Sequence, residues 1–185
     1  MQAMDSLRGQ LIVASPAIED PNFRRSVVLI GHHDPDGALG VVINRPTGTN
    51  LAEAAPPVAE MTGDGDSELF LGGPVMSEAV VVVAEFESPD DAAMLAFGSV
   101  GLLGTASDPQ DVERRTRRFR AFAGHAGWSR GQLDDELDRE DWIAAPASAD
   151  LVFSDEPGEL WSKVLTDLGG AYELLARMPD DPSVN

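Results

Sequence analysis

The sharpest chemical pattern in the sequence is a serine set between glycines. Gly127-Trp128-Ser129-Arg130-Gly131 matches G-x-S-x-G, the strand-to-helix turn that presents a nucleophilic serine in acyl-transfer enzymes. Such a serine needs a base within hydrogen-bonding reach, and in those enzymes the histidine follows the serine along the chain. Here His32, His33 and His125 all precede Ser129. We therefore interpret the pattern as a tight turn whose serine caps the following helix, and keep a hydrolase-like enzyme using Ser129 or His125 as the alternative.

Two other groups of residues have the types that bind metal ions. His32-His33-Asp34 falls where a strand enters a turn, and adjacent side chains of a strand point to opposite faces, so the two imidazoles do not easily reach one ion. Asp64, Asp66 and Glu68 alternate in a glycine-containing loop without the spacing of an EF-hand. We interpret both groups as solvated turns, and we predict no metal and no cofactor.

Composition limits the partners that these residues could serve. The 185 residues include 32 Asp and Glu against 13 Lys and Arg, a net charge of −19, which disfavours direct binding to nucleic acid or to an anionic membrane. Cysteine is absent, which excludes disulfides, cysteine-ligated zinc and a thiol nucleophile. We find no signal-peptide pattern and no apolar stretch near the ~20 residues of a membrane span, so we expect a cytoplasmic protein.

The positive charge that exists is concentrated. Five arginines lie between Arg114 and Arg120, and a run of acidic residues follows over Asp134–Asp141. Alone, the arginines would suggest a site for a polyanion. We predict instead that the strand edge Arg117–Arg120 lies near the acidic run and is partly neutralised by it, through exposed pairs worth only about 0–1 kcal/mol each.

Hydrophobic periodicity and turn residues predict the elements that position these groups. The expected strands are 10–14, 26–30, 39–43, 68–71, 79–86, 117–123 and 142–145, and the expected helices are 50–55, 108–115, 131–140 and 157–168. The strand 79–86 is wholly apolar apart from Glu85, which suggests burial on both faces. We interpret Ala54–Ser67, which is rich in Pro and Gly, as a surface loop. Strands come first and helices are interspersed later, which indicates an α+β fold rather than a doubly wound sheet.

Several motifs together resemble one family, the YqgE/AlgH family. The match runs in order over roughly residues 7–170, and it is carried by Leu11–Pro16, Asp20–Leu29, Gly37–Pro46, Gly72-Gly73-Pro74-Val75, and Gly124–Leu133 with Trp142. The resemblance implies a single bacterial domain over residues 1–178, with a mainly antiparallel, bifurcated sheet folded into a pseudo-barrel and flanked by helices. We expect the tail at 179–185 to be disordered.

The resemblance also bears on function. It implies an uncharacterised family without an established enzymatic activity, some of whose members carry a regulator label. Family members often have glycine at the position of Ser129 and tyrosine at that of His125, which disfavours both as catalytic groups. We therefore predict a non-enzymatic binding or regulatory protein, with a transcription-related role among the options, acting through a protein or small-molecule partner.

The motif residues have a structural and a functional interpretation. Structurally, the glycines permit close backbone approach, the tryptophans supply buried area, and Asn44 and Arg45 tie loops together. Functionally, polar groups at strand ends beside glycine-rich turns would form one ligand groove. The candidate ligand-binding residues are Asn44, Arg45, Gly72, Gly73, His125, Trp128 and Gln132.

Overall fold

A ten-stranded sheet organises the residues that the computed structural model describes, 5–104 and 108–180. Its strands are β1 (Leu11–Ala14), β2 (Val27–Asp34), β3 (Gly37–Val42), β4 (Pro46–Asn50), β5 (Glu68–Leu71), β6 (Val75–Phe86), β7 (Met94–Phe97), β8 (Val100–Leu102), β9 (Thr116–Trp128) and β10 (Trp142–Ala145). The helices are α1 (Leu51–Ala54), α2 (Pro56–Thr62), α3 (Pro109–Arg115), α4 (Gln132–Asp138), α5 (Ala149–Val152), α6 (Leu160–Leu168) and α7 (Ala171–Ala176), with short 3₁₀ turns at Pro89–Asp91 and Pro157–Glu159. No helix of this described part is long and apolar enough to span a membrane.

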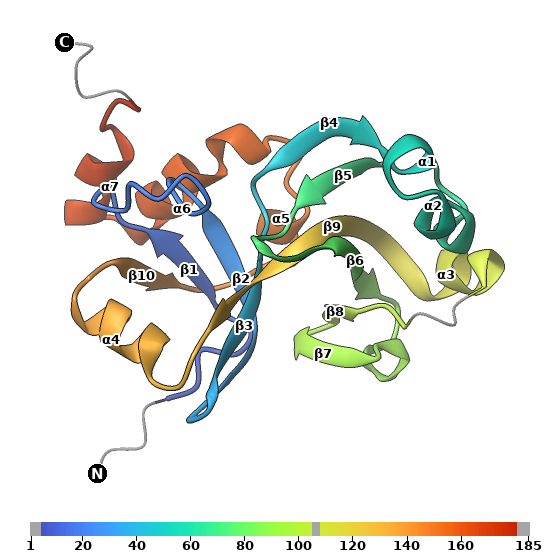
Figure 1. Cartoon of the computed structure of the whole chain (residues 1–185), viewed down its shortest axis with the longest axis horizontal. Coiled ribbons are helices and arrows are strands. Elements are labelled where there is room, and N and C mark those ends of the chain that lie inside the picture. Colours follow the sequence, from blue (N-terminus) through green and yellow to red (C-terminus); the bar gives the residue numbers. More distant parts are fainter. Residues whose placement is uncertain (1–4, 105–107, 181–185) are drawn as a thin grey trace.

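The long strand β9 is where the sheet forks. It crosses the molecule with α3 at one end and α4 at the other (Figure 1). Along one edge it pairs antiparallel with β6. Along the other edge it pairs first with β5, in parallel, and then with the hairpin strand β3, antiparallel. This bifurcated, mostly antiparallel arrangement confirms the α+β fold that the sequence predicts.

The sheet curls into an open pseudo-barrel. Its strands follow the order β10-β1-β2-β3-β9-β6-β8-β7, with β4 joined on through β5. Strands β2 and β7 approach each other across the interior, and side chains from both face one pocket. Within the described residues β10 and β7 end this path, so the sheet is not a closed barrel.

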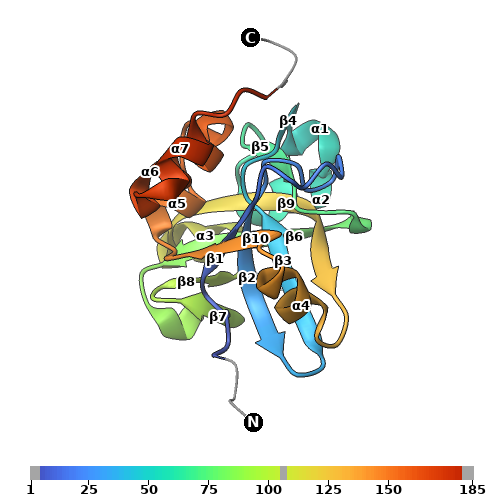
Figure 2. The same ribbon diagram turned by 90° about the vertical axis from the view of Figure 1, so that its left-hand side faces the viewer.

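Helices cover both faces of the β1–β2 region. All four β1 residues are buried, because alternate side chains enter two different cores. Leu11 and Val13 pack with Trp161 and Leu165 of α6, whereas Ile12 and Ala14 pack in the core that holds Leu133 of α4. Figure 2 shows α5, α6 and α7 gathered on one side of β1 and α4 on the other.

Two sequence expectations need correction. The predicted loop Ala54–Ser67 contains the helix α2, which starts at Pro56 because proline suits the first helical turn, and which ends at Gly63 with φ of 70°. Strand β6 begins at Val75 and is exposed over its first five residues, so consecutive buried residues are limited to Val82–Ala84, with Phe86 buried beyond them. Of the tail predicted to be disordered, Pro179 and Asp180 are described and residues 181–185 lie outside the described part.

Candidate functional site

Asn44 and Arg45 hold the loop between β1 and β2. The Asn44 side chain accepts a hydrogen bond from the Val27 N–H and donates one to the Arg25 carbonyl, both at 2.9 Å. Arg45 donates to the carbonyls of Pro21 and Arg24, both at 2.7 Å. Burial lowers the pKa of Arg45, and the nearby Asp20 carboxylate opposes that shift. These contacts confirm that the pair ties loops together, as predicted.

Gly72 and Gly73 allow the β5–β6 connection to lie directly on β9. The Gly72 N–H donates to the Ala123 carbonyl, and the Gly72 carbonyl accepts from the Val42 N–H, both at 2.8 Å. A Cβ atom added to Gly73 would lie 2.3 Å from the His125 carbonyl carbon. The same crowding holds at Gly124, which has φ of 71°. Close backbone approach therefore explains why these positions are glycine.

Trp128 and Gln132 meet at a carboxylate that the sequence reasoning missed. Glu136 Oε2 accepts hydrogen bonds from the indole N–H groups of Trp128, at 2.9 Å, and Trp142, at 2.8 Å. Glu136 Oε1 accepts from the Gln132 amide at 2.9 Å. The two indole rings pack edge to face, with centroids 5.9 Å apart. The sequence signal was the i, i+4 spacing of Gln132 and Glu136 on α4.

The Ser129 hydroxyl has a partner that is not a base. It donates to the Gln132 side-chain oxygen at 3.2 Å, and the same oxygen accepts from the Ser129 N–H at 3.0 Å. The prediction that the Ser129 side chain caps α4 is therefore wrong. The N-cap of α4 is Gly131, and the side chain of Gln132, the first residue of the helix, accepts hydrogen bonds from Ser129. This exposed serine lacks the histidine contact that nucleophilic activation requires.

The histidine and aspartate groups organise their own turns. His32 Nε2 lies 2.8 Å from Asp34 Oδ2. His33, buried on the other side of the strand, accepts from the Leu7 N–H through Nδ1 at 3.0 Å and faces Asp134 through Nε2 at 3.2 Å. In the other loop, Asp64 accepts from the backbone of Asp66 and Ser67 at 3.1 Å.

The arginines between Arg114 and Arg120 are neutralised, but not by the predicted partner. The acidic helix α4 lies at the opposite end of β9 (Figure 1). Arg118 instead pairs with Glu85 at 2.7 Å and Asp150 at 2.8 Å, and its hydrogen bond to Asp150 raises its pKa. Arg114 pairs with Asp111. Arg115 pairs with Asp111 and Asp91, and Arg117 pairs with Glu87 and Glu85.

Arg120 is the member of this group that lies inside the fold. It donates to the carbonyls of Val152 and Ser154, and its guanidinium lies 4.3 Å from the centroid of the Phe70 ring. Burial lowers its pKa. The predicted neutralisation within the chain is thus present, and cross-strand and loop acids supply it in place of the acidic run. Arg114 and Arg117 remain exposed, but their charges are balanced by acids of the same chain.

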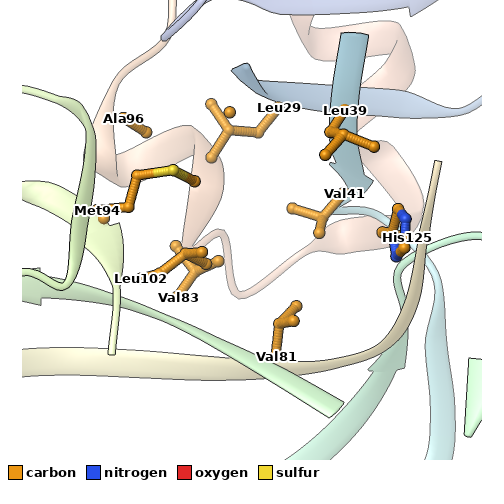
Figure 3. Close-up of a pocket in the computed structure, with 12 residues that line it drawn as sticks. Leu29, Leu39, Val41, Val81, Val83, Met94, Ala96, Leu102 and His125 are labelled. Atoms are coloured by element: carbon orange, nitrogen blue, oxygen red, sulfur yellow. The ribbon is translucent and has the colours of Figure 1, made fainter. Parts of the chain in front are cut away.

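His125 faces an apolar pocket inside the pseudo-barrel (Figure 3). The pocket has a volume of about 130 Å³ and lies between β2 and β3 on one side and β6, β7 and β8 on the other. Among the described residues that line it, His125 is the only titratable one. Leu39 and Met94 are 48% and 41% exposed, so they form part of an open rim. The lining residues are Leu29, Gly31, Leu39, Gly40, Val41, Val81, Val83, Met94, Ala96, Gly101, Leu102 and His125.

The seven candidate residues therefore lie in three places rather than around one groove. Asn44 and Arg45 border a hollow beside the β1–β2 loop, and Trp128 and Gln132 border another beside α4. Gly72 and Gly73 pack on the backbone near His125, which faces the apolar pocket. Sequence reasoning missed the other pocket residues because apolar strand residues around a pocket have the same pattern as those of a filled core.

Comparisons with known proteins agree on one family. The family described as AlgH-like, DUF179, matches residues 11–173. A UPF0301 protein of Streptomyces avermitilis is 38% identical over 100% of this chain and 98% of its own length. Another UPF0301 protein, of Thermobifida fusca, is 41% identical over 97% of this chain and 96% of its own length.

Solved structures give the same result. The crystal structure of a Corynebacterium diphtheriae protein is similar with a TM-score of 0.83 at 26% identity, covering 96% of this chain and 95% of that one. The solution structure of the AlgH protein from Pseudomonas aeruginosa is similar with a TM-score of 0.70 at 27% identity, covering 98% of each chain.

Proposed function

The chain belongs to the AlgH-like family, and from that premise we propose that it is a non-enzymatic binding protein whose pseudo-barrel pocket takes a small apolar molecule. The observation that carries the proposal is the pocket itself, a space of about 130 Å³ walled by aliphatic side chains and open at its rim. Dense packing is the rule in protein interiors, so a space of this size beside well-formed strands calls for an occupant.

The size and chemistry of the pocket define the ligand class. An apolar cavity of roughly 150 Å³ holds a ring the size of benzene. Each methylene that a ligand buries contributes about 0.8 kcal/mol. The lining offers Leu29, Val83 and Leu102 to such a ligand and a single imidazole, His125, to one polar end. We therefore propose a compact aromatic or short alkyl molecule that carries one hydrogen-bonding group.

The residues around Ser129 support a binding protein better than a hydrolase. The Ser129 hydroxyl is bonded to Gln132, whereas His125 lines the pocket between the strands. A catalytic pair needs a hydrogen bond of about 2.6–3.2 Å between nucleophile and base, with some slack in the free enzyme. The two groups that the enzymatic alternative would use thus serve different parts of the molecule.

A transcription-related role through direct DNA contact receives no support from the arginines between Arg114 and Arg120. Their partners are carboxylates such as Glu85 and Asp111, together with backbone carbonyls. Releasing these side chains to phosphate would cost the contacts that they already make, in a protein whose net charge is −19.

Titration with toluene tests the proposal on the unmodified protein. In methyl-resolved NMR spectra, we expect saturable shifts of the Leu29, Val83 and Leu102 methyl groups, with a dissociation constant of about 1 mM or below. Leu51, fully buried in a separate core, is the internal reference and should not shift. Shifts that do not saturate up to the solubility limit of toluene, or that appear equally at Leu51, would overturn the proposal.

A further inference from the structure

Two arginines in the β1–β2 loop bind the end of the described chain, Met178–Asp180, which we call the tail segment. Arg25 donates to the Met178 carbonyl, and Arg24 donates to the Asp180 carbonyl. The Arg25 Nε atom also lies 2.7 Å from the Asp180 carboxylate. The loop therefore recognises two main-chain carbonyls and one acidic side chain, which are the features of an extended acidic peptide.

Arg25 is held in place for this contact by groups outside the tail segment. Its guanidinium lies 4.4 Å from the centroid of the Trp161 ring, and the Trp161 N–H is fixed by a hydrogen bond of 2.8 Å to the Ala14 carbonyl. Its backbone has φ of 53°, a conformation rare for a residue with a side chain, and the Asn44 amide donates to its carbonyl. Strained backbone of this kind is concentrated at binding sites.

Two hollows beside the tail segment leave space that the tail segment does not fill. A hollow of about 510 Å³ on one side and another of about 460 Å³ both include Arg24, Arg25 and Asp180 in their walls. The Asp180 side chain is 76% exposed. Ion pairs of such exposure are weak, so the tail segment is held by contacts that another acidic chain can replace.

We propose that Arg24 and Arg25 form a binding site for an acidic peptide segment of a partner protein, and that the tail segment occupies this site in cis as a competitor. The adjoining guanidinium of Arg45 adds positive charge to one of the two hollows. Because the competitor is part of the same chain, its effective concentration is high, and a partner must displace it to bind. The tail segment thus limits access to the site without closing it.

The test uses the full chain and a fluorescent peptide with the sequence of residues 177–184, whose binding is followed by anisotropy. We expect the Asp180→Asn variant to bind the peptide about tenfold more tightly than the unmodified protein, because its cis competitor is weakened. Asp138→Asn removes the same charge from the exposed end of α4 and should leave the affinity unchanged. The double variant Asp180→Asn/Arg24→Gln should lose binding.

Arg24 is half exposed, so its replacement leaves the core intact, and circular dichroism checks that each variant is folded. A peptide with asparagine at the Asp180 position should not bind to Asp180→Asn. The proposal is overturned if the peptide binds none of the variants, or binds Asp180→Asn and Asp138→Asn equally. It is also overturned if Asp180→Asn forms a dimer by exchanging tails, because the occupant would then be a second copy of this chain.

Discussion

The Trp128 indole N–H donates to Glu136 Oε2 at 2.9 Å, so the tryptophan of the G-x-S-x-G pattern is held by a carboxylate of α4, eight residues further along the chain. The Trp142 indole uses the same oxygen. The pattern therefore fastens β9 and β10 to α4, and the serine within it sits at the edge of this arrangement. This is a structural explanation for a sequence that resembles a catalytic turn.

Replacing Glu136 should destabilise the fold. In Glu136→Gln the two indole donors lose a charged acceptor, and we expect the free energy of unfolding to fall by about 1–3 kcal/mol in urea titrations. Asp138→Asn, on the exposed side of the same helix, is the matched control and should change stability by less than about 0.5 kcal/mol. Equal losses in the two variants would show that Glu136 contributes only its charge to the surface.

Replacing Arg45 should lower the free energy of unfolding more than replacing an exposed arginine. Arg45→Met leaves the carbonyls of Pro21 and Arg24 without their donor, and we expect a loss of about 1–3 kcal/mol in the free energy of unfolding. Arg130→Met removes an exposed ion pair with Asp36 and should cost about 0–1 kcal/mol. Faster amide exchange at Phe23 and Arg24 in the first variant alone would locate the effect in the β1–β2 loop.

The turn between β2 and β3 should lose stability in acid, because the Asp34 carboxylate becomes protonated. Its carboxylate accepts from the Asp36 N–H at 2.8 Å and pairs with His32, and these contacts lower its pKa below the usual 3.8. A lowered pKa means that this contribution to stability is present above the unfolded value and is lost as pH falls through the folded value. An NMR titration should give a pKa for Asp34 below 3.8, and the His32→Ala variant should have a higher Asp34 pKa than the unmodified protein.

Ser129 should be chemically ordinary. A fluorophosphonate reagent labels serines that a base activates, and we expect no labelling of this protein because the Ser129 hydroxyl is bonded to an amide oxygen. Labelling that disappears in Ser129→Ala would support the hydrolase alternative instead.

Local patterns predicted the elements that are defined by their own residues. Helix α6 follows from the spacing of Trp161, Leu165 and Leu168, and Asn50 caps α1 through the Glu53 N–H as its position suggested. What failed depends on distant pairing. The partners of Arg118 come from β6 and α5, which no sequence window connects to it, and the short strands β7 and β8 exist because they extend the sheet from β6.

The site was harder to predict than the fold. The sequence predicts that the polar side chains of Asn44 and Arg45 tie loops together, and the structure shows that they bind backbone groups of the β1–β2 loop. The pocket was not foreseen, because Val81 and Val83 look the same in sequence whether they face a filled core or an open space. Whether these valines face a filled core or an open space depends on how the sheet curls around the fork at β9.

A pair of neighbouring valines offers the most direct test of the proposed function. Val80 and Val81 are both half-buried on β6, but their side chains face opposite sides of the sheet and only Val81 lines the pocket. Val81→Phe should fill the pocket and weaken toluene binding at least about tenfold, whereas Val80→Phe should leave the affinity within about twofold of the unmodified protein. Toluene binding that survives Val81→Phe, or that falls equally in both variants, would contradict the assignment of this pocket as the ligand site.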